Sequence, residues 1–187
     1  MFQYALMVIQ GLGVAKDTTE GETWLLRAAE LGHPGAQSEF GSARLSDYLR
    51  QLTSDAEPAI RWLSRAADQG DASAMFALGA FYQGAKPVTG YNAPERGAQL
   101  MRKCSEQTLD PRCAFAYATL LETGHGTPID LVQAYGFYRL AEDVKKTPSG
   151  TERLADLEKQ LSVDDLKKGR ELAQRVRERY SSSRSRG

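Results

Sequence analysis

The two cysteines, Cys104 and Cys113, are the residues of this chain whose spacing most directly suggests chemistry. They flank a segment that resembles a turn between two helices, and each stands where related helices of the chain have a small residue. Such positions face each other where helices pack, at a separation that suits a disulfide. Closing so short a loop stabilises a fold by about 2–3 kcal/mol in the chain-entropy model. The alternative is a pair of buried thiols that fill small-residue sites.

The two histidines, His33 and His125, lie in glycine-containing segments typical of turns, so we expect turn or capping roles for them. Two cysteines and two histidines, none at the short intervals of a zinc module, predict no metal site. The sequence also gives no reason to expect a cofactor.

Paired acids, such as Asp164 with Asp165, stand at expected helix starts, where the helix dipole favours them. The sequence contains no Gly-x-Ser-x-Gly, His-Glu-x-x-His, Gly-x-x-x-x-Gly-Lys or Ser-x-x-Lys motif. We therefore expect a protein without catalytic activity.

The bulk composition limits the class of partner. The 187 residues include 24 Lys and Arg and 24 Asp and Glu, so the net charge is zero and no basic field for nucleic acid is expected. No apolar run approaches 18 residues, which predicts no membrane span.

The elements that must position these residues follow from a repeat in the sequence. Large apolar residues recur 38, 38 and 37 residues apart at Trp24, Trp62, Leu100 and Phe137. A period of this length is typical of stacked two-helix units that cannot bury their apolar faces alone. A second series pairs a large residue with a small one, at Tyr4-Ala5, Phe40-Gly41, Leu78-Gly79 and Tyr117-Ala118. Such pairs let two helices approach closely.

No segment shows the alternation of a strand, so we expect an all-α chain. The expected helices are 2–11, 18–31, 34–49, 55–69, 72–84, 93–107, 111–123, 128–144, 150–161 and 163–180. First-turn prolines are expected at Pro34, Pro111 and Pro128. Capping-box spacing is found at Thr19/Glu22, Ser54/Glu57 and Ser162/Asp165. Residues 181–187 contain no apolar side chain and are expected to be disordered.

Over residues 1–145, the repeated pattern resembles the Sel-one-like repeats, relatives of tetratricopeptide repeats. The resemblance rests on turns such as Gly11-Leu12-Gly13-Val14 and on the Ala-Ala pairs at 28–29 and 66–67. It implies a right-handed α-α superhelix of about four two-helix repeats, closed by a C-terminal helical cap at 146–180. The first residues match the middle of a repeat helix, so we expect the array to be truncated at its N-terminal end.

The resemblance implies a scaffold or adaptor that binds a protein or peptide in a concave groove. In tetratricopeptide geometry, one row of the groove comprises Phe2, Ser38, Phe76 and Phe115, with Gln83, Arg112 and Glu122 nearby. An aromatic row of this kind suits an extended peptide or a helix. The alternative is that Phe76 and Phe115 simply pack against neighbouring helices.

Two other functions remain open at this level. Some cysteine-rich relatives are described as weak β-lactam-binding or β-lactam-hydrolysing proteins, although the missing Ser-x-x-Lys motif is unfavourable to that activity. The groove could instead be filled by a second copy in a structural self-association module. Exported relatives carry cysteine pairs in a similar place, which points to the bacterial periplasm or cell envelope, whereas two thiols would fit the cytoplasm.

The C-terminal end is basic, with Arg170, Arg175, Arg177, Arg179, Arg184 and Arg186. Such an end could contact an acidic partner or a membrane surface. The alternative is that these residues favour the helix C-terminus and remain solvated.

Overall fold

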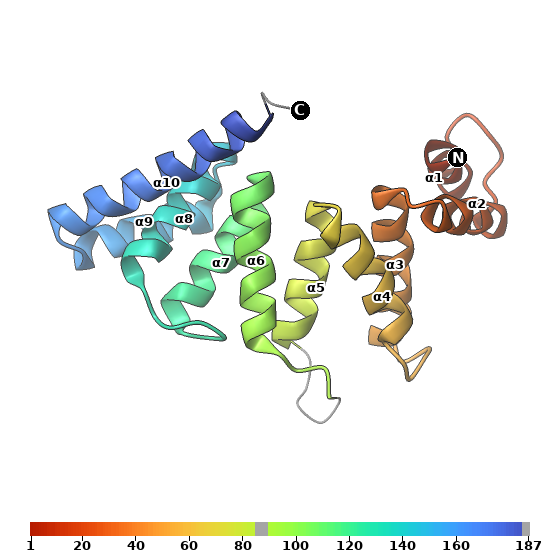
Figure 1. The fold of residues 1–187 in the computed structure, drawn as a ribbon, viewed down its shortest axis with the longest axis horizontal. Coiled ribbons are helices and arrows are strands. Elements are labelled where there is room, and N and C mark those ends of the chain that lie inside the picture. Colours follow the sequence, from red (N-terminus) through yellow and green to blue (C-terminus); the bar gives the residue numbers. More distant parts are fainter. Residues whose placement is uncertain (85–89, 185–187) are drawn as a thin grey trace. The chain divides into compact units, whose positions relative to one another are not determined.

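The computed structural model describes residues 1–84 and 90–184, and their side chains as far as residue 182. Within these residues the chain forms α-helices and no β-strand (Figure 1). The helices are α1 (Phe2–Gln10), α2 (Thr18–Glu30), α3 (Pro34–Leu49), α4 (Glu57–Asp68), α5 (Ala72–Gly84), α6 (Pro94–Thr108), α7 (Pro111–Thr123), α8 (Leu131–Val144), α9 (Pro148–Gln160) and α10 (Val163–Arg184). The prediction of an all-α repeat fold is confirmed.

The repeated aromatic residues form the packing contact inside a helix pair. In three repeats, a ring of the first helix packs edge-on against a ring of the second. The ring centroids lie 5.7 Å apart for Tyr4–Trp24, 5.8 Å for Phe40–Trp62 and 4.8 Å for Tyr117–Phe137. Aromatic pairs favour this edge-to-face arrangement because the positive ring edge meets the negative ring face.

The small residue beside each large one is where the two helices of a repeat touch. A Cβ on Gly41 of α3 would lie 2.8 Å from Cγ of Leu63 in α4. A Cβ on Gly79 of α5 would lie 2.9 Å from Cε of Met101 in α6. The same position is alanine in α1 and α7, and both alanines are fully buried. The small residue that recurs with each repeat therefore marks the contact between its two helices.

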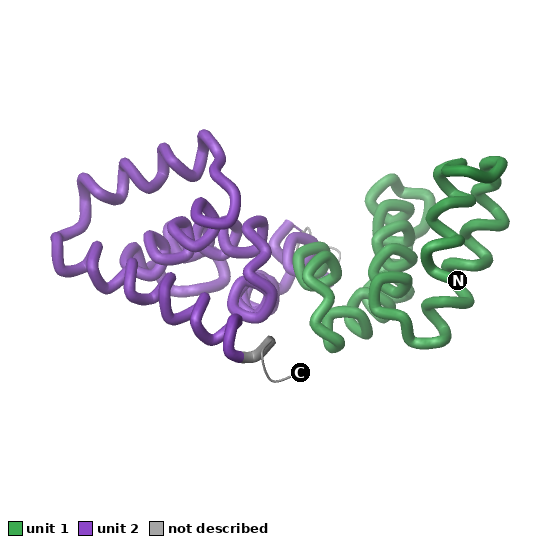
Figure 2. Tube along the Cα trace, turned by 90° about the horizontal axis from the view of Figure 1, so that it is seen from above, with its two compact units in different colours: residues 1–78 green, residues 79–187 purple. Residues whose placement is uncertain are grey.

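The chain divides into two compact units, Met1–Leu78 and Gly79–Gly187, with the boundary inside α5 (Figure 2). The first unit has a core of Ala5, Leu25, Ala28, Ala29 and Ala36, with Trp24 and Trp62 packed against it. The second unit buries the aromatic side chains of Tyr135, Phe137 and Tyr138 almost completely.

The helix starts agree only partly with the sequence expectations. Pro34 and Pro111 occupy the first turn as predicted, and Ser162 accepts a hydrogen bond from the backbone N–H of Asp165. By contrast, Asp17 rather than Thr19 caps α2, and Asp130 caps α8. The prediction for Pro128 is therefore wrong, because α8 begins at Leu131.

The cap consists of α9 and α10, which pack on α8. The buried hydroxyl of Tyr135 on α8 donates to Glu158 of α9 at 2.9 Å and accepts from Nε of Arg170 on α10 at 3.3 Å. Asp143 of α8 forms an ion pair with Arg177 of α10. Helix α10 continues to Arg184, beyond the end expected at 180, and residues 185–187 of the expected disordered tail lie outside the described residues.

Candidate functional site

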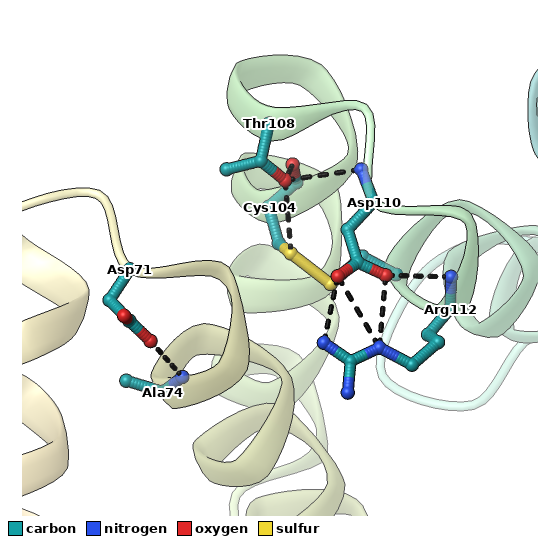
Figure 3. Close-up of polar contacts among 7 residues, drawn as sticks. Asp71, Ala74, Cys104, Thr108, Asp110 and Arg112 are labelled. Atoms are coloured by element: carbon teal, nitrogen blue, oxygen red, sulfur yellow. Dashed lines mark hydrogen bonds and ion pairs between the residues drawn. A yellow bond between two sulfur atoms is a disulfide. The ribbon is translucent and has the colours of Figure 1, made fainter. Parts of the chain in front are cut away.

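The cysteine pair lies between the last turn of α6 and the first turn of α7. Cys104 and Cys113 form a disulfide, with their Cα atoms 5.8 Å apart (Figure 3). Both residues are fully buried. Beside the disulfide, the hydroxyl of Thr108 donates to the carbonyl oxygen of Cys104 at 2.7 Å. Because the sulfur atoms are bonded to each other and enclosed, their contribution is to hold two repeats together.

The turn after the disulfide fixes the side chain of Arg112. Asp110 caps α7 by accepting from the backbone N–H of Arg112 at 2.8 Å, and it also accepts from Nη2 of Arg112 at 2.8 Å (Figure 3). Burial alone would raise the pKa of the Asp110 carboxyl, but the hydrogen bonds and charge of Arg112 lower it overall. The guanidinium of Arg112 therefore helps to stabilise the N-terminal turn of α7.

Phe115 lies one turn further along α7 and is half-buried. Its ring packs edge-on against Tyr138 of α8, with 5.1 Å between centroids. The packing alternative for this residue is thus confirmed, whereas its role in a binding groove stays a prediction. The ring of Phe115 packs against the neighbouring helix, and the residue keeps part of its surface exposed.

Glu122 joins three helices on the same side of α7. Its Oε2 accepts from the hydroxyl of Tyr138 at 2.8 Å, and its Oε1 lies 3.6 Å from the guanidinium of Arg153 on α9. The Tyr138 hydroxyl also lies 3.1 Å from that of Thr119. Burial, followed by the hydrogen bond to Glu122, raises the pKa of Tyr138 to about 12. We name Phe115, Thr119, Glu122 and Arg153 the α7 surface, and Tyr138 lies buried beneath it.

The remaining predicted groove residues are used differently. Ser38 is 2% exposed, so the expectation that it lines an open groove is wrong. Serine has a short side chain, so at this buried position it does not reach the protein surface. Gln83 is half-buried, and its Nε2 donates to the carbonyl oxygen of Pro94 at 2.7 Å, which ties α5 to the start of α6.

Phe2 and Phe76 belong to the first unit, whereas Phe115 belongs to the second. Phe2 stacks on His33 at 4.5 Å between ring centroids, and Nδ1 of His33 accepts from the N–H of Ala36 to cap α3. The capping role predicted for His33 is confirmed. Phe76 is half-buried on α5. An aromatic row that joins Phe76 to Phe115 stays a prediction.

Sequence reasoning missed Tyr138 and Arg153. Tyr138 directly follows Phe137, which marks the aromatic series, and this neighbour was the available signal. Arg153 carries no signal, because its approach to Glu122 depends on how α9 packs against the repeats.

Across residues 1–84 and 90–184, His, Cys, Asp and Glu side chains form no group of three that could hold a metal ion. No helix in this part of the chain is long and apolar enough to cross a bilayer.

These features define an α-helical repeat protein with a mixed aromatic and charged surface in its second unit. The family model of the Sel1 repeat matches residues 1–33, 41–71, 72–108 and 111–143, which correspond to the four helix pairs. The chain therefore belongs to the Sel1 repeat family. Sel1 repeat proteins generally mediate protein–protein interactions and are generally non-catalytic scaffolds. No curated protein sequence is significantly similar to the chain.

Solved structures of bacterial proteins share the fold. A protective antigen with an SLR fold, present in uropathogenic Escherichia coli strains, superposes with a TM-score of 0.78 at 26% identity. The match covers 97% of this chain and 38% of the antigen, so the chain spans well under half of that protein. A Sel1 repeat protein from Oxalobacter formigenes superposes with a TM-score of 0.72 at 25% identity, over 97% of this chain and 71% of the other.

Proposed function

We propose that this chain is a non-catalytic adaptor that binds a partner protein or peptide on the α7 surface. The supporting observation is the half-buried ring of Phe115, held edge-on by Tyr138 beside the Glu122–Arg153 ion pair. Aromatic residues, phenylalanine included, and arginine are enriched at protein interfaces, and arginine is among the residues that dominate binding energy there. Phe115 supplies the apolar contact, and Glu122 and Arg153 orient polar groups of the partner.

A comparison of captured proteins tests this proposal. The native chain, Phe115→Ser and Arg153→Ala are used to isolate partners from native lysate, with circular dichroism to verify folding. Val163→Ser is the matched control, because Val163 is an apolar side chain of the same unit that is 83% exposed. A partner that is lost from both folded variants and kept by the control supports the α7 surface. A partner that both variants retain excludes this surface.

Arg153→Ala keeps the test decisive if Phe115→Ser does not fold, since the side chain of Arg153 is 53% exposed. Self-association is a separate outcome. If the native chain shows a concentration-dependent mass in light scattering that both variants abolish, the surface binds a second copy and the adaptor proposal is wrong.

The proposed adaptor has no catalytic activity and resides in an oxidising compartment. The buried, bonded cysteines support a structural role, and disulfides persist in oxidising compartments such as the periplasm or cell envelope. A chromogenic β-lactam should show no turnover with the purified chain, and measurable turnover would contradict a purely binding role. A thiol count on natively extracted, denatured protein should find no free thiols, whereas two would place the chain in a reducing compartment.

A further inference from the structure

A second surface of the second unit lies where α10 passes over α8 and α6. The three helices enclose a cleft of about 310 Å³, at the lower end of the range for ligand clefts of about 300–1,000 Å³. Its floor is apolar, formed by Phe137, Leu172 and Val176, and its rim carries Arg102, Arg175 and Arg179. Phe137 and Val176 are almost fully buried, whereas Leu172 is half-buried and accessible.

The arginines of α10 have different environments. Arg177 forms an ion pair with Asp143 of α8 and is committed to the fold. Arg175 and Arg179 are exposed, and neither forms an ion pair with any residue in the described part of the chain. Spaced four residues apart, they are neighbours on one helix face, and like charges at this spacing repel. An anion between them would relieve that repulsion.

The rest of the rim leaves the cleft cationic. Arg102 pairs with the carboxylate of Glu106 at 2.9 Å, so the one acid of the cleft is already neutralised. Gln133, which also lines the cleft, donates through Nε2 to Asp130 at 2.7 Å. The two guanidinium groups of Arg175 and Arg179 are therefore the unneutralised charges of the cleft.

We propose that this cleft binds an acidic peptide segment of a partner protein. Carboxylates of the segment pair with Arg175 and Arg179, whose planar forks match carboxylate oxygens, and one apolar side chain contacts Leu172. Charge complementarity and the apolar floor favour this occupant over nucleic acid. A phosphate backbone needs an extended basic field, which a chain of zero net charge lacks, and the ring of Phe137 is too buried to stack on a base.

The test selects binders from a phage-displayed library of random octapeptides on the native chain. The enriched peptides are then synthesised and measured by fluorescence anisotropy. We expect enriched peptides to carry Asp or Glu beside an apolar residue, and to bind Arg175→Gln/Arg179→Gln about tenfold more weakly. The matched control is Arg61→Gln/Lys167→Gln, which removes the same charge from exposed positions outside the cleft and should leave affinity unchanged.

Three results would overturn the proposal. They are enrichment without acidic residues, no enrichment, and acidic peptides whose affinity is insensitive to Arg175→Gln/Arg179→Gln. A labelled single-stranded DNA dodecamer that binds the native chain more tightly than the peptides, and is lost in that variant, would assign the cleft to nucleic acid instead. The cleft and the α7 surface share no residue. Phe115→Ser should therefore leave peptide affinity unchanged, which separates its failure from that of the proposed function.

Discussion

The hydroxyl of Tyr138 donates a hydrogen bond to Oε2 of Glu122 at 2.8 Å, across the contact between α8 and α7. The tyrosine is completely buried, and the glutamate carries an ion pair to Arg153 on α9. The hydrogen bond thus joins the two helices of the last repeat, and the ion pair connects that repeat to its cap. Stability and binding are therefore coupled at Glu122.

Replacing Tyr138 by phenylalanine should destabilise the chain by about 1.5–3 kcal/mol at pH 7, since it removes a hydrogen bond to a charged acceptor. Urea unfolding followed by circular dichroism measures this difference. The ring contact with Phe115 is retained in the variant, so the loss reports the hydroxyl alone. A difference near zero would show that Arg153 alone satisfies Glu122.

The contribution of Tyr138 should also depend on pH. Its folded-state pKa of about 12 lies above the ordinary value of 10, so the folded state holds the proton more tightly than the unfolded state. The stabilisation is fully present below pH 10 and is lost as the pH rises from 10 to about 12. The difference in unfolding free energy between the native chain and Tyr138→Phe should shrink across that window. A difference that stays constant from pH 8 to 11 would contradict this.

Reduction of the Cys104–Cys113 disulfide should lower the free energy of unfolding by about 2–3 kcal/mol, because it releases the closed loop in the unfolded chain. Urea titrations with and without a phosphine reductant give the value. A Cys104→Ala/Cys113→Ala variant provides the control, since reductant should have no effect on it. Equal stability of the reduced and oxidised native chain would contradict a stabilising role.

Most of the fold could be predicted from the sequence because each repeat encodes its own helix–helix contact. Large residues such as Trp62 and small ones such as Gly41 recur at fixed spacing, and in the structure they meet their partners across the pair. Helix starts were less predictable. Asp17 and Thr19 both suit an N-cap, and the sequence alone does not show which of them the packed helix selects.

The candidate site could be predicted only in part. The two cysteines occupy small-residue positions of the repeat, which predicts that they lie close together. Phe115 lies two residues before Tyr117 of a large–small pair, which predicts its place on the first helix of the repeat. Ser38 occupies the register position of Phe115, but the same register leaves a short side chain enclosed in the core. The approach of Arg153 to Glu122, and that of Arg175 to the cleft, depends on the docking of α9 and α10, which lie outside the repeat period.

The crossing of α8 and α10 predicts the effect of a single methyl group. A Cβ on Gly136 would lie 2.8 Å from the carbonyl oxygen of Gly169 and 3.0 Å from Cδ2 of Leu172. Because the nearest atom belongs to the backbone of α10, it cannot move aside as a side chain could. Gly136→Ala should therefore destabilise the chain by about 1–3 kcal/mol, although alanine has the better helix propensity. Gly84→Ala is the control, because a Cβ there meets no neighbouring atom within 4 Å among the residues that the structure describes. Urea unfolding should show the loss for Gly136→Ala only, and equal effects would contradict close packing.

The docking of α9 depends on a carboxylate enclosed beneath its first turn. Glu142 of α8 is 7% exposed. Its Oε1 accepts from the N–H and the hydroxyl of Thr147 at 2.9 and 2.8 Å, and its Oε2 accepts from the hydroxyl of Thr151 at 3.0 Å. Both carboxylate oxygens thus accept hydrogen bonds, whereas a glutamine side chain has only one acceptor oxygen. Glu142→Gln would replace one carboxylate oxygen by an amide N–H₂, which only donates, and would remove the negative charge that strengthens the hydrogen bonds from Thr147 and Thr151.

We therefore expect Glu142→Gln to destabilise the chain by about 1–3 kcal/mol and to speed hydrogen exchange at the amides of α9. Glu152→Gln is the matched control, since Glu152 is exposed on the same helix. Exchange measured by mass spectrometry should rise in α9 for Glu142→Gln and remain native-like for Glu152→Gln. Because Arg153 reaches Glu122 from α9, loosening this helix should also weaken any partner held on the α7 surface. Native-like exchange in Glu142→Gln would show that α9 is held by its apolar contacts alone.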